Sequence, residues 1–349
     1  MKLEKALGVE LPIIQAPMAG VQDSALAIQV SRAGGLGSVP CAALSLNEIE
    51  LELRSIKQAT TGPVNLNFFC HHPPKLKPSI ESRWHELLMP YFIELGIELD
   101  AIPTTVNREP FSHAVVDILE PFEPPVISFH FGLPARDLID RLKLWGTTIL
   151  SSATTLEEAL WLQENGADMI IAQGIEAGGH RGMFLTKSLE SQSSTASLVS
   201  EFQEKIKLPI IAAGGISSAS DVASQLNIGA FAVQIGTAYL LCDEANTSPL
   251  HRRAIKENNP PTTTLTNLFS GRPARAIINR VIKELGPISQ EAPEFPLAAK
   301  AMSTLRKVAE RNDSSDFSPL WCGQNTQACE SMSAYEQTLK LASKLDINS

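Results

Sequence analysis

The sequence predicts an α/β fold, a (β/α)8 TIM barrel with a small helical lid inserted after the eighth strand. Eight short apolar runs occur, each followed by Gly, Pro or polar residues and then by a helical pattern, as expected for parallel strands covered on both faces. Three of these runs end in glycine-containing loops, at the end of the strand where barrel enzymes bind their ligands. Eight such units favour a closed barrel over an open sheet. The runs lie at residues 12–16, 36–39, 64–68, 126–129, 148–151, 169–172, 210–213 and 231–235.

Helices are predicted between most of these strands. The clearest begins at Ser45, because Ser45 and Glu48 have the spacing of a capping box, in which each side chain binds the backbone N–H of the other residue. The interval between the third and fourth strands is too long for one crossover, so we expect two helices there. The Ser-rich stretch 190–200 is expected to be an exposed loop. The predicted helices lie at 45–58, 81–95, 111–119, 155–165 and 218–226, with a last helix at about 330–345.

The chain is predicted to contain a barrel and a lid. Residues 1–242 hold all eight strands, close to the size of about 250 residues that is typical of such barrels. The sequence that follows contains turn-forming residues at 286–293 and fits no further strand-helix unit. We therefore assign residues 243–320 to a small helical lid or substrate domain, and residues 321–349 to a final segment that returns to the barrel.

The composition is typical of a globular protein that acts on small molecules. Of the 349 residues 44% are hydrophobic and 19% charged, and the net charge is −9. Nucleic acids and anionic membranes attract basic proteins, so neither is an expected partner. The five cysteines are scattered and include no Cys-x-x-Cys pair, so we expect neither a disulfide framework nor a metal site. The chain shows no leader-like apolar start and no run of about 18 apolar residues, which favours a cytoplasmic location.

The most informative loop follows the sixth strand, where residues 172–182 read Ala-Gln-Gly-Ile-Glu-Ala-Gly-Gly-His-Arg-Gly. Glycines let the backbone approach a ligand closely, and His180 adds one titratable side chain. The loops after the last two strands contain Gly214-Gly215 and Gly236-Thr237. Barrels often bind phosphate there through backbone N–H groups. The three loops together predict a phosphorylated cofactor.

Side chains at the ends of other strands suit a flat heteroaromatic ring. Pro17 and Met18 follow the first strand, Asn67 lies at the end of the third, and His130 follows the fourth. A thioether can pack on the face of such a ring, and an amide can bind its carbonyl edge.

On these residues the chain resembles the nitronate monooxygenases, FMN-dependent barrel enzymes formerly called 2-nitropropane dioxygenases. The stretch Ser-Phe-His-Phe-Gly at 128–132 is specific, whereas a flavin-dependent enoyl-acyl carrier protein reductase shares a similar Glu-Ala-Gly-Gly-His core. The matching motifs run in order from residue 11 to about 325. They are Gln-Ala-Pro-Met at 15–18, Asn-Leu-Asn-Phe-Phe at 65–69, Ser-Phe-His-Phe-Gly at 128–132, the loop at 173–182, Ala-Gly-Gly-Ile at 213–216, Gln-Ile-Gly-Thr at 234–237 and Phe-Ser-Gly-Arg-Pro-Ala-Arg at 269–275.

The resemblance implies a role for each matching residue. His180 would stand over the flavin beside the substrate, and His130 is the second candidate catalytic residue. The residues implied to contact the flavin ring or its ribityl chain are Pro17, Met18, Asn67, Gln173 and Gln234. Those implied to hold the ribityl and phosphate end are Gly178, Gly179, Gly214, Gly215, Gly236 and Thr237.

The implied reaction is the oxidation of an alkyl nitronate, such as propionate 3-nitronate, by dioxygen to a carbonyl compound and nitrite. This reaction would use FMN as cofactor and would detoxify the nitronate. A homodimer is a possible assembly of the chain. His180 and His130 would hold the negative charge of the nitronate. If neutral nitroalkanes are accepted, His180 with an ordinary pKa of about 6.5 suits removal of the α-proton.

Three rival functions stay open. One is an NADH- or NADPH-dependent flavin reductase that acts on an enoyl-acyl carrier protein or a quinone. Another is a barrel dehydrogenase acting on a nucleotide or a hydroxy acid. The third is a flavin-binding protein without turnover.

A few further residues have no assigned role. Arg272 and Arg275 suit a structural role as well as a place in the site. His71 and His72 are expected in a surface turn, because two prolines follow them. Lys300 lies where a lid side chain could cover the substrate. Residues 294–311 contain no tyrosine, which the lids of the similar enzymes often carry, so the sequence does not fix the substrate.

Overall fold

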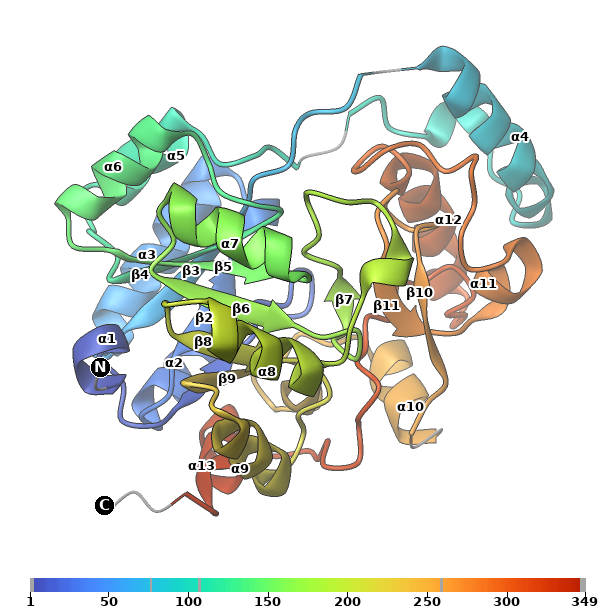
Figure 1. Ribbon diagram of the computed structural model, residues 1–349. Helices are drawn as coiled ribbons and strands as arrows, with labels where there is room; N and C mark the ends of the chain where they lie inside the picture. The colour runs from blue at the N-terminus through green and yellow to red at the C-terminus, as the bar shows by residue number, and fades with distance from the viewer. Residues whose placement is uncertain (1–2, 76, 106–107, 258–259, 346–349) are drawn as a thin grey trace.

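The computed structural model describes residues 3–75, 77–105, 108–257 and 260–345. Its centre is a barrel of eight parallel strands in the order β1-β9-β8-β6-β5-β4-β3-β2 (Figure 1). The ring closes between β1 and β2, where the amide of Leu36 donates to the carbonyl of Ile13 at 2.9 Å. The predicted fold class is confirmed. The strands are β1 (Ile13–Gln15), β2 (Gly37–Pro40), β3 (Val64–Phe69), β4 (Val126–His130), β5 (Thr148–Ala153), β6 (Met169–Gln173), β8 (Ile210–Ala213) and β9 (Ala232–Ile235).

Apolar side chains fill the interior of the barrel. Ile14, Leu150, Ile171 and Ile211 come from four different strands and belong to one buried cluster, which Leu7 joins from α1 (Leu3–Leu7). The interior is therefore a packed core, as is usual for this fold.

Helices surround the barrel and pack on the outer faces of the strands (Figure 1). The capping box of Ser45 and Glu48 is present, as predicted. The surrounding helices are α2 (Ser24–Arg32), α3 (Leu46–Ala59), α5 (His113–Leu119), α6 (Arg136–Leu144), α7 (Leu156–Asn165), α8 (Thr195–Lys205), α9 (Ala219–Ile228) and α13 (Ala334–Ala342). Short 3-10 turns are η1 (Cys41–Ala43), η2 (Leu99–Ala101), η3 (Leu189–Ser191) and η4 (Thr237–Tyr239).

The prediction of an exposed loop over 190–200 is wrong in its second half, because α8 begins at Thr195. Ser194 is the N-cap of this helix, and its side chain accepts a hydrogen bond from the amide of Ser197. Leu198 and Phe202 are buried on the inner face of the helix. The serines that suggested a loop therefore start a helix, which is a common role for serine.

The segment after β9 is not purely helical, contrary to the prediction. It contains α10 (Pro249–Glu257), α11 (Arg280–Leu285) and α12 (Ala299–Arg311), but also β10 (Thr263–Thr266) and β11 (Ala274–Ile277). These two strands form a three-stranded antiparallel sheet with β7 (Gly179–His180), which belongs to the loop after β6. Strand pairing thus joins the segment after β9 to the loop at residues 172–182.

One helix from the barrel half of the sequence lies against the lid. α4 (Pro78–Glu94) extends away from the barrel beside α12 (Figure 1). Leu88 of α4 and Leu305 of α12 share a buried cluster, and Lys300 forms an ion pair with Glu81. The division of the chain at residues 242 and 320 stays a prediction.

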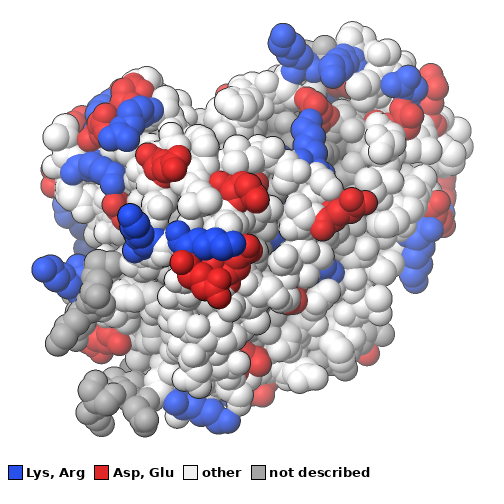
Figure 2. All heavy atoms as spheres, viewed as in Figure 1, with Lys and Arg blue, Asp and Glu red and all other residues white. Residues whose placement is uncertain are grey.

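Charges of both signs are mixed on the face of the molecule that Figure 2 shows. Lys143 pairs with Asp168 at 2.7 Å, and Arg136 pairs with Asp140 at 2.9 Å. In the described ranges, no helix combines the length and the apolar character needed to cross a membrane.

Candidate active site

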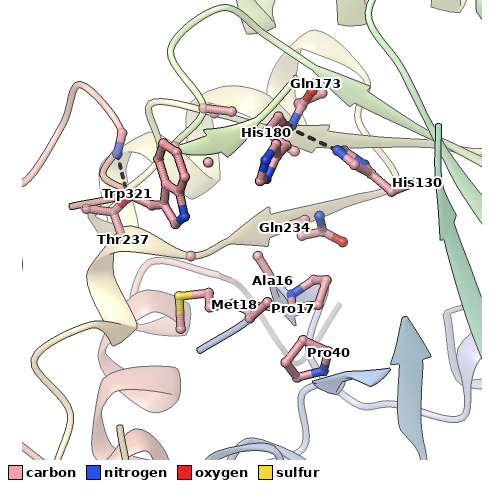
Figure 3. A pocket seen from close by; sticks show the side chains of 18 of the residues that line it. Ala16, Pro17, Met18, Pro40, His130, Gln173, His180, Gln234, Thr237 and Trp321 are labelled. Carbon is pink, nitrogen blue, oxygen red and sulfur yellow. Dashed lines mark hydrogen bonds between the residues drawn. The ribbon is translucent and has the colours of Figure 1, made fainter. Parts of the chain in front are cut away.

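A cavity opens at the carboxyl ends of the barrel strands (Figure 3). It encloses about 1430 Å³ of space, part of it open to solvent. Met18, Gln234 and His180 approach it from different strands and loops. All residues predicted from the sequence to bind cofactor or substrate line this cavity, and their roles stay predictions. They are Pro17, Met18, Asn67, His130, Gln173, Gly178, Gly179, His180, Gly214, Gly215, Gln234, Gly236 and Thr237.

The glycine loops form a cradle that larger residues would fill. A Cβ atom at Gly178 would lie 2.6 Å from the backbone nitrogen of Gly323, and one at Gly214 would lie 2.7 Å from Thr195 Oγ1. Gly214 and Gly215 also have φ angles of 126° and 70°, which L side chains rarely adopt. Glycine is required here because backbone segments meet closely, so the loops can surround a ligand with main-chain atoms.

The segment that follows the lid completes the cradle. The amide of Gly323 donates to Thr237 Oγ1 at 2.9 Å, and Asn325 Nδ2 donates to the carbonyl of Gly215 at 3.0 Å. Gly323, Asn325 and Trp321 all line the cavity. The sequence analysis missed them because Gly323 follows Thr237 by 86 residues and no apolar run precedes it.

The two glutamines of the cavity differ in their hydrogen bonding. Gln173 Oε1 accepts from the amide of Gly182 at 2.7 Å, and Gln173 Nε2 donates to the carbonyl of His180 at 2.9 Å. This amide therefore braces the loop. Gln234 Oε1 is buried and has no hydrogen-bond partner within the described residues. An unpaired buried acceptor is costly, so Gln234 suits a ligand that donates an N–H.

The lid holds His180 in place. In the β7–β11 pairing His180 lies opposite Ala274, and His180 Nε2 is 2.8 Å from Ser270 Oγ. The centroid of its ring lies 5.3 Å from that of Trp321 and 5.5 Å from that of Phe295. Residues after the barrel thus fix an imidazole that the barrel loop contributes to the cavity.

His130 uses both ring nitrogens within the protein. Nε2 lies 3.1 Å from the carbonyl of His180, and Nδ1 lies 3.1 Å from Ser152 Oγ. A carbonyl can only accept, so Nε2 carries the proton and Nδ1 accepts from the serine hydroxyl. This geometry favours a role in positioning the backbone of His180, and direct contact of His130 with substrate stays a prediction.

Both imidazoles are neutral at ordinary pH. Burial, followed by electrostatic interactions with His130, Arg108 and Arg272, lowers the pKa of His180 from 6.5 to about 3. Burial also lowers the pKa of His130 to about 3. The ordinary pKa that the sequence analysis used for His180 therefore does not apply. A neutral His180 can accept a proton, and negative charge that develops beside it would raise its pKa.

The prediction that His71 lies in a surface turn is wrong. The residue is 7% exposed, and its ring centroid lies 4.9 Å from that of Phe295. Its pKa falls to about 4, chiefly through burial, although a hydrogen bond to the backbone of Arg108 opposes the shift. His72 is exposed, and residues 71–75 form no turn.

The remaining unassigned residues take different places. The Arg272 guanidinium lies 3.9 Å over the ring centroid of Phe131. Arg275 Nε donates to the carbonyl of Ile175 at 2.9 Å and so braces the loop after β6. Lys300 pairs with Glu81 on α4 and is not part of the cavity wall. Arg108 and His251 do line the cavity, although no sequence motif marks them.

A barrel whose glycine cradle and half-buried histidine share one cavity is typical of a cofactor-dependent barrel enzyme. The sequence pattern of the family described as nitronate monooxygenase matches residues 1–341. The chain belongs to the nitronate monooxygenase family, whose members are flavin-dependent oxidoreductases. The resemblance inferred from the motifs is confirmed.

Individual proteins agree with this assignment. The chain is 36% identical to a nitronate monooxygenase of Pseudomonas aeruginosa, with 99% of each chain covered. It is 37% identical to one from Paraburkholderia phytofirmans, covering 97% of this chain and 93% of the relative. Among solved structures, a nitroalkane oxidase from Streptomyces ansochromogenes has a TM-score of 0.89 at 35% identity, covering 98% of this chain and 97% of its own. FabK from Thermotoga maritima shares the fold, with a TM-score of 0.74 at 24% identity, covering 98% of this chain and 94% of its own.

Proposed function

We propose that this chain oxidises alkyl nitronates, such as propionate 3-nitronate, with dioxygen and bound FMN. The products are a carbonyl compound and nitrite, so the reaction removes a reactive anion. The observation that carries the proposal is that neutral His180 lies in the wall of the same cavity as the glycine cradle. The names of the curated relatives and of the similar solved structure support the same activity.

FMN is the flavin that fits the cavity best. Gly178, Gly214 and Gly215 form one cradle, which suits a single phosphate. Gln234 Oε1 lacks a partner and suits an N–H at the edge of the flavin ring. Met18 lies beside Gly236, where its thioether can pack on the ring face. A bound flavin supplies an electron-accepting ring that passes electrons from the nitronate to dioxygen.

The contact with Ser270 is compatible with either neutral tautomer of His180. When His180 Nε2–H donates to Ser270 Oγ, the lone pair on Nδ1 is available to take the α-proton of a neutral nitroalkane. When the serine hydroxyl donates to Nε2 instead, Nδ1–H can donate to a nitronate oxygen. A hydroxyl both donates and accepts, so either tautomer is satisfied.

An apolar cluster packs beside the half-buried His180. The ring centroids of Phe69 and Phe131 are 5.0 Å apart, and those of Phe131 and Phe295 are 5.5 Å apart. Phe131 and Phe295 are 3% and 6% exposed. Hydrogen bonds from His180 to a substrate are stronger in these surroundings than in water.

The cytoplasmic location and the homodimer stay predictions. Among the rival functions, the enoyl reductase gains no support from FabK, because 24% identity supports no more than the fold. A flavin-binding protein without turnover differs from the proposal only in kinetics.

The purified protein is expected to be yellow and to release FMN, not FAD, on denaturation. The reason is the single phosphate cradle in the cavity wall. The measurement is chromatography of the released flavin against both standards. Release of FAD would contradict the cofactor assignment, and a colourless protein that does not take up added FMN would contradict the proposed function.

A further inference from the structure

The cavity wall contains a positively charged side chain, Arg108. Arg108 lines the cavity, and its Nη1 atom is shielded from solvent and has no hydrogen-bond partner in the described part of the chain. Burial lowers the pKa of Arg108. Removing a guanidinium from water is costly unless an anion or several acceptors replace the water.

Three other buried cations, Arg181, Arg275 and Lys300, have partners among the described residues. Arg181 is fully buried, and its guanidinium donates to the carbonyls of Gly174 at 2.6 Å and Gln173 at 2.7 Å. Arg275 donates to a loop carbonyl, and Lys300 pairs with a carboxylate. Arg108 differs from them because it lines the cavity and its Nη1 atom has no acceptor among the described residues, which indicates that a ligand supplies one.

A second guanidinium adds to the charge near Arg108. Arg272 also has a shielded Nη1 atom without a partner among the described residues, and it lies over Phe131. The charges of Arg108 and Arg272 both lower the pKa values of His71 and His180. Both guanidinium groups therefore act on the end of the cavity near His180, and the carboxylates of Glu158 and Glu294 also act on Arg272.

The phosphate of the cofactor does not explain Arg108. The phosphate cradle follows β8 and β9, whereas Arg108 lies in the excursion between β3 and β4, on a different side of the strand order. His71 forms a hydrogen bond with the backbone of Arg108, and the ring centroid of Phe295 lies 4.9 Å from that of His71 and 5.5 Å from that of His180. Arg108 therefore lies on the His180 side of the cavity, where the substrate would react. The missing acceptor is therefore a group of the substrate.

We propose that Arg108 determines substrate specificity by binding a carboxylate on the tail of the nitronate. The inference rests on the proposed function. The nitronate group lies beside His180, a short carbon chain contacts Phe69 in the cavity wall, and the carboxylate at its far end accepts a hydrogen bond from Arg108. The enzyme then prefers dianionic nitronates to nitronates with an uncharged tail.

The kinetic test compares two substrates that differ in this group alone. Propionate 3-nitronate carries a carboxylate where propyl 1-nitronate carries a methyl group. In Arg108→Met, kcat/KM for propionate 3-nitronate is expected to fall roughly ten- to hundredfold through KM, the range for a hydrogen bond to a charged group. For propyl 1-nitronate it should change less than about threefold, since this substrate never used that bond. Arg108→Lys should recover part of the loss because it keeps the charge.

Lys187→Met is the matched control. It removes one positive charge from a side chain that is 91% exposed and lies outside the cavity wall. It should leave both substrates unaffected. Equal losses on both substrates in Arg108→Met, or no loss on either, would overturn the proposal.

A binding measurement tests the anion site without relying on catalytic activity. A carboxylate has the shape of a nitronate group, so succinate mimics propionate 3-nitronate and propionate mimics ethyl nitronate. Calorimetry on the flavin-loaded wild type should show that succinate binds at least about tenfold more tightly than propionate, and Arg108→Met should abolish this preference. If no nitronate is oxidised but the preference is found, the proposed function fails and the anion site stands. If wild type shows no preference, the anion site fails whether or not the variants fold.

Discussion

A Gly215→Glu variant is expected to purify without flavin. Gly215 has a φ angle of 70°, and a Cβ atom there would lie 3.3 Å from the Cβ atom of Glu176. The new side chain would extend from the cradle beside an existing carboxylate. Its negative charge would repel a phosphate at the place where backbone N–H groups should bind one. Steric and electrostatic effects act in the same direction, so the ratio of flavin to protein should fall from near one to near zero.

Gly146→Glu is the control for the backbone strain of this substitution. Gly146 has a φ angle of 76°, and a Cβ atom there would meet nothing within 4 Å. It lies between α6 and β5, before a strand and not after one, so it is at the end of the barrel opposite the cavity. Both variants carry a similar cost of about 1–2 kcal/mol for the left-handed conformation. Circular dichroism confirms folding. A folded Gly215→Glu protein that keeps its full flavin content would contradict the cradle assignment.

His180→Asn should lose most turnover of a neutral nitroalkane while it keeps its flavin. A general base typically contributes about 10²- to 10⁴-fold to the rate, and an asparagine cannot take the α-proton. With nitroethane, kcat/KM should fall within that range. With preformed ethyl nitronate the loss should be smaller, because the proton is already gone and only a hydrogen-bond donor is changed. Equal losses on both forms would show that His180 orients the substrate and is not a base.

The pH dependence of the rate on nitroethane tests the protonation state of His180. With its pKa near 3, His180 is unprotonated from pH 5 upward, so its capacity to accept a proton should not change between pH 5 and 7.5. An ordinary histidine would lose activity as the pH falls through 6.5. A fall of the wild-type rate on nitroethane through 6.5, absent in His180→Asn, would contradict the neutral state derived from burial. His85→Asn is a suitable control, because His85 lies on α4 outside the cavity wall.

The sequence was sufficient for the features that short segments encode. The barrel strands are short segments rich in apolar residues because both of their faces are buried, so most can be recognised without any knowledge of their partners. The Ser45 and Glu48 capping box is a local hydrogen-bond pattern. Gly178 and Gly214 were identifiable because only glycine tolerates the close backbone contacts of these loops.

The features that were missed depend on contacts between distant segments. The pairing of β7 with β11 joins Gly179 to Arg275, and a two-residue strand has no pattern of its own. His71 is buried by Phe295, which lies far along the chain. Arg108 comes from a long excursion whose path the apolar runs do not define. Such residues become candidates only when the fold brings them to one cavity.

The most direct test of the account is oxygen consumption by the purified, flavin-loaded protein with ethyl nitronate and no NADH or NADPH. If the chain is a nitronate monooxygenase, we expect nitronate-dependent oxygen uptake together with nitrite release, and very slow anaerobic bleaching of the flavin by either nucleotide. Heat-denatured protein measures the spontaneous reaction of the nitronate with oxygen. Rapid flavin reduction by NADH or NADPH, with no oxygen uptake on ethyl nitronate or propionate 3-nitronate, would contradict the account and favour a reductase.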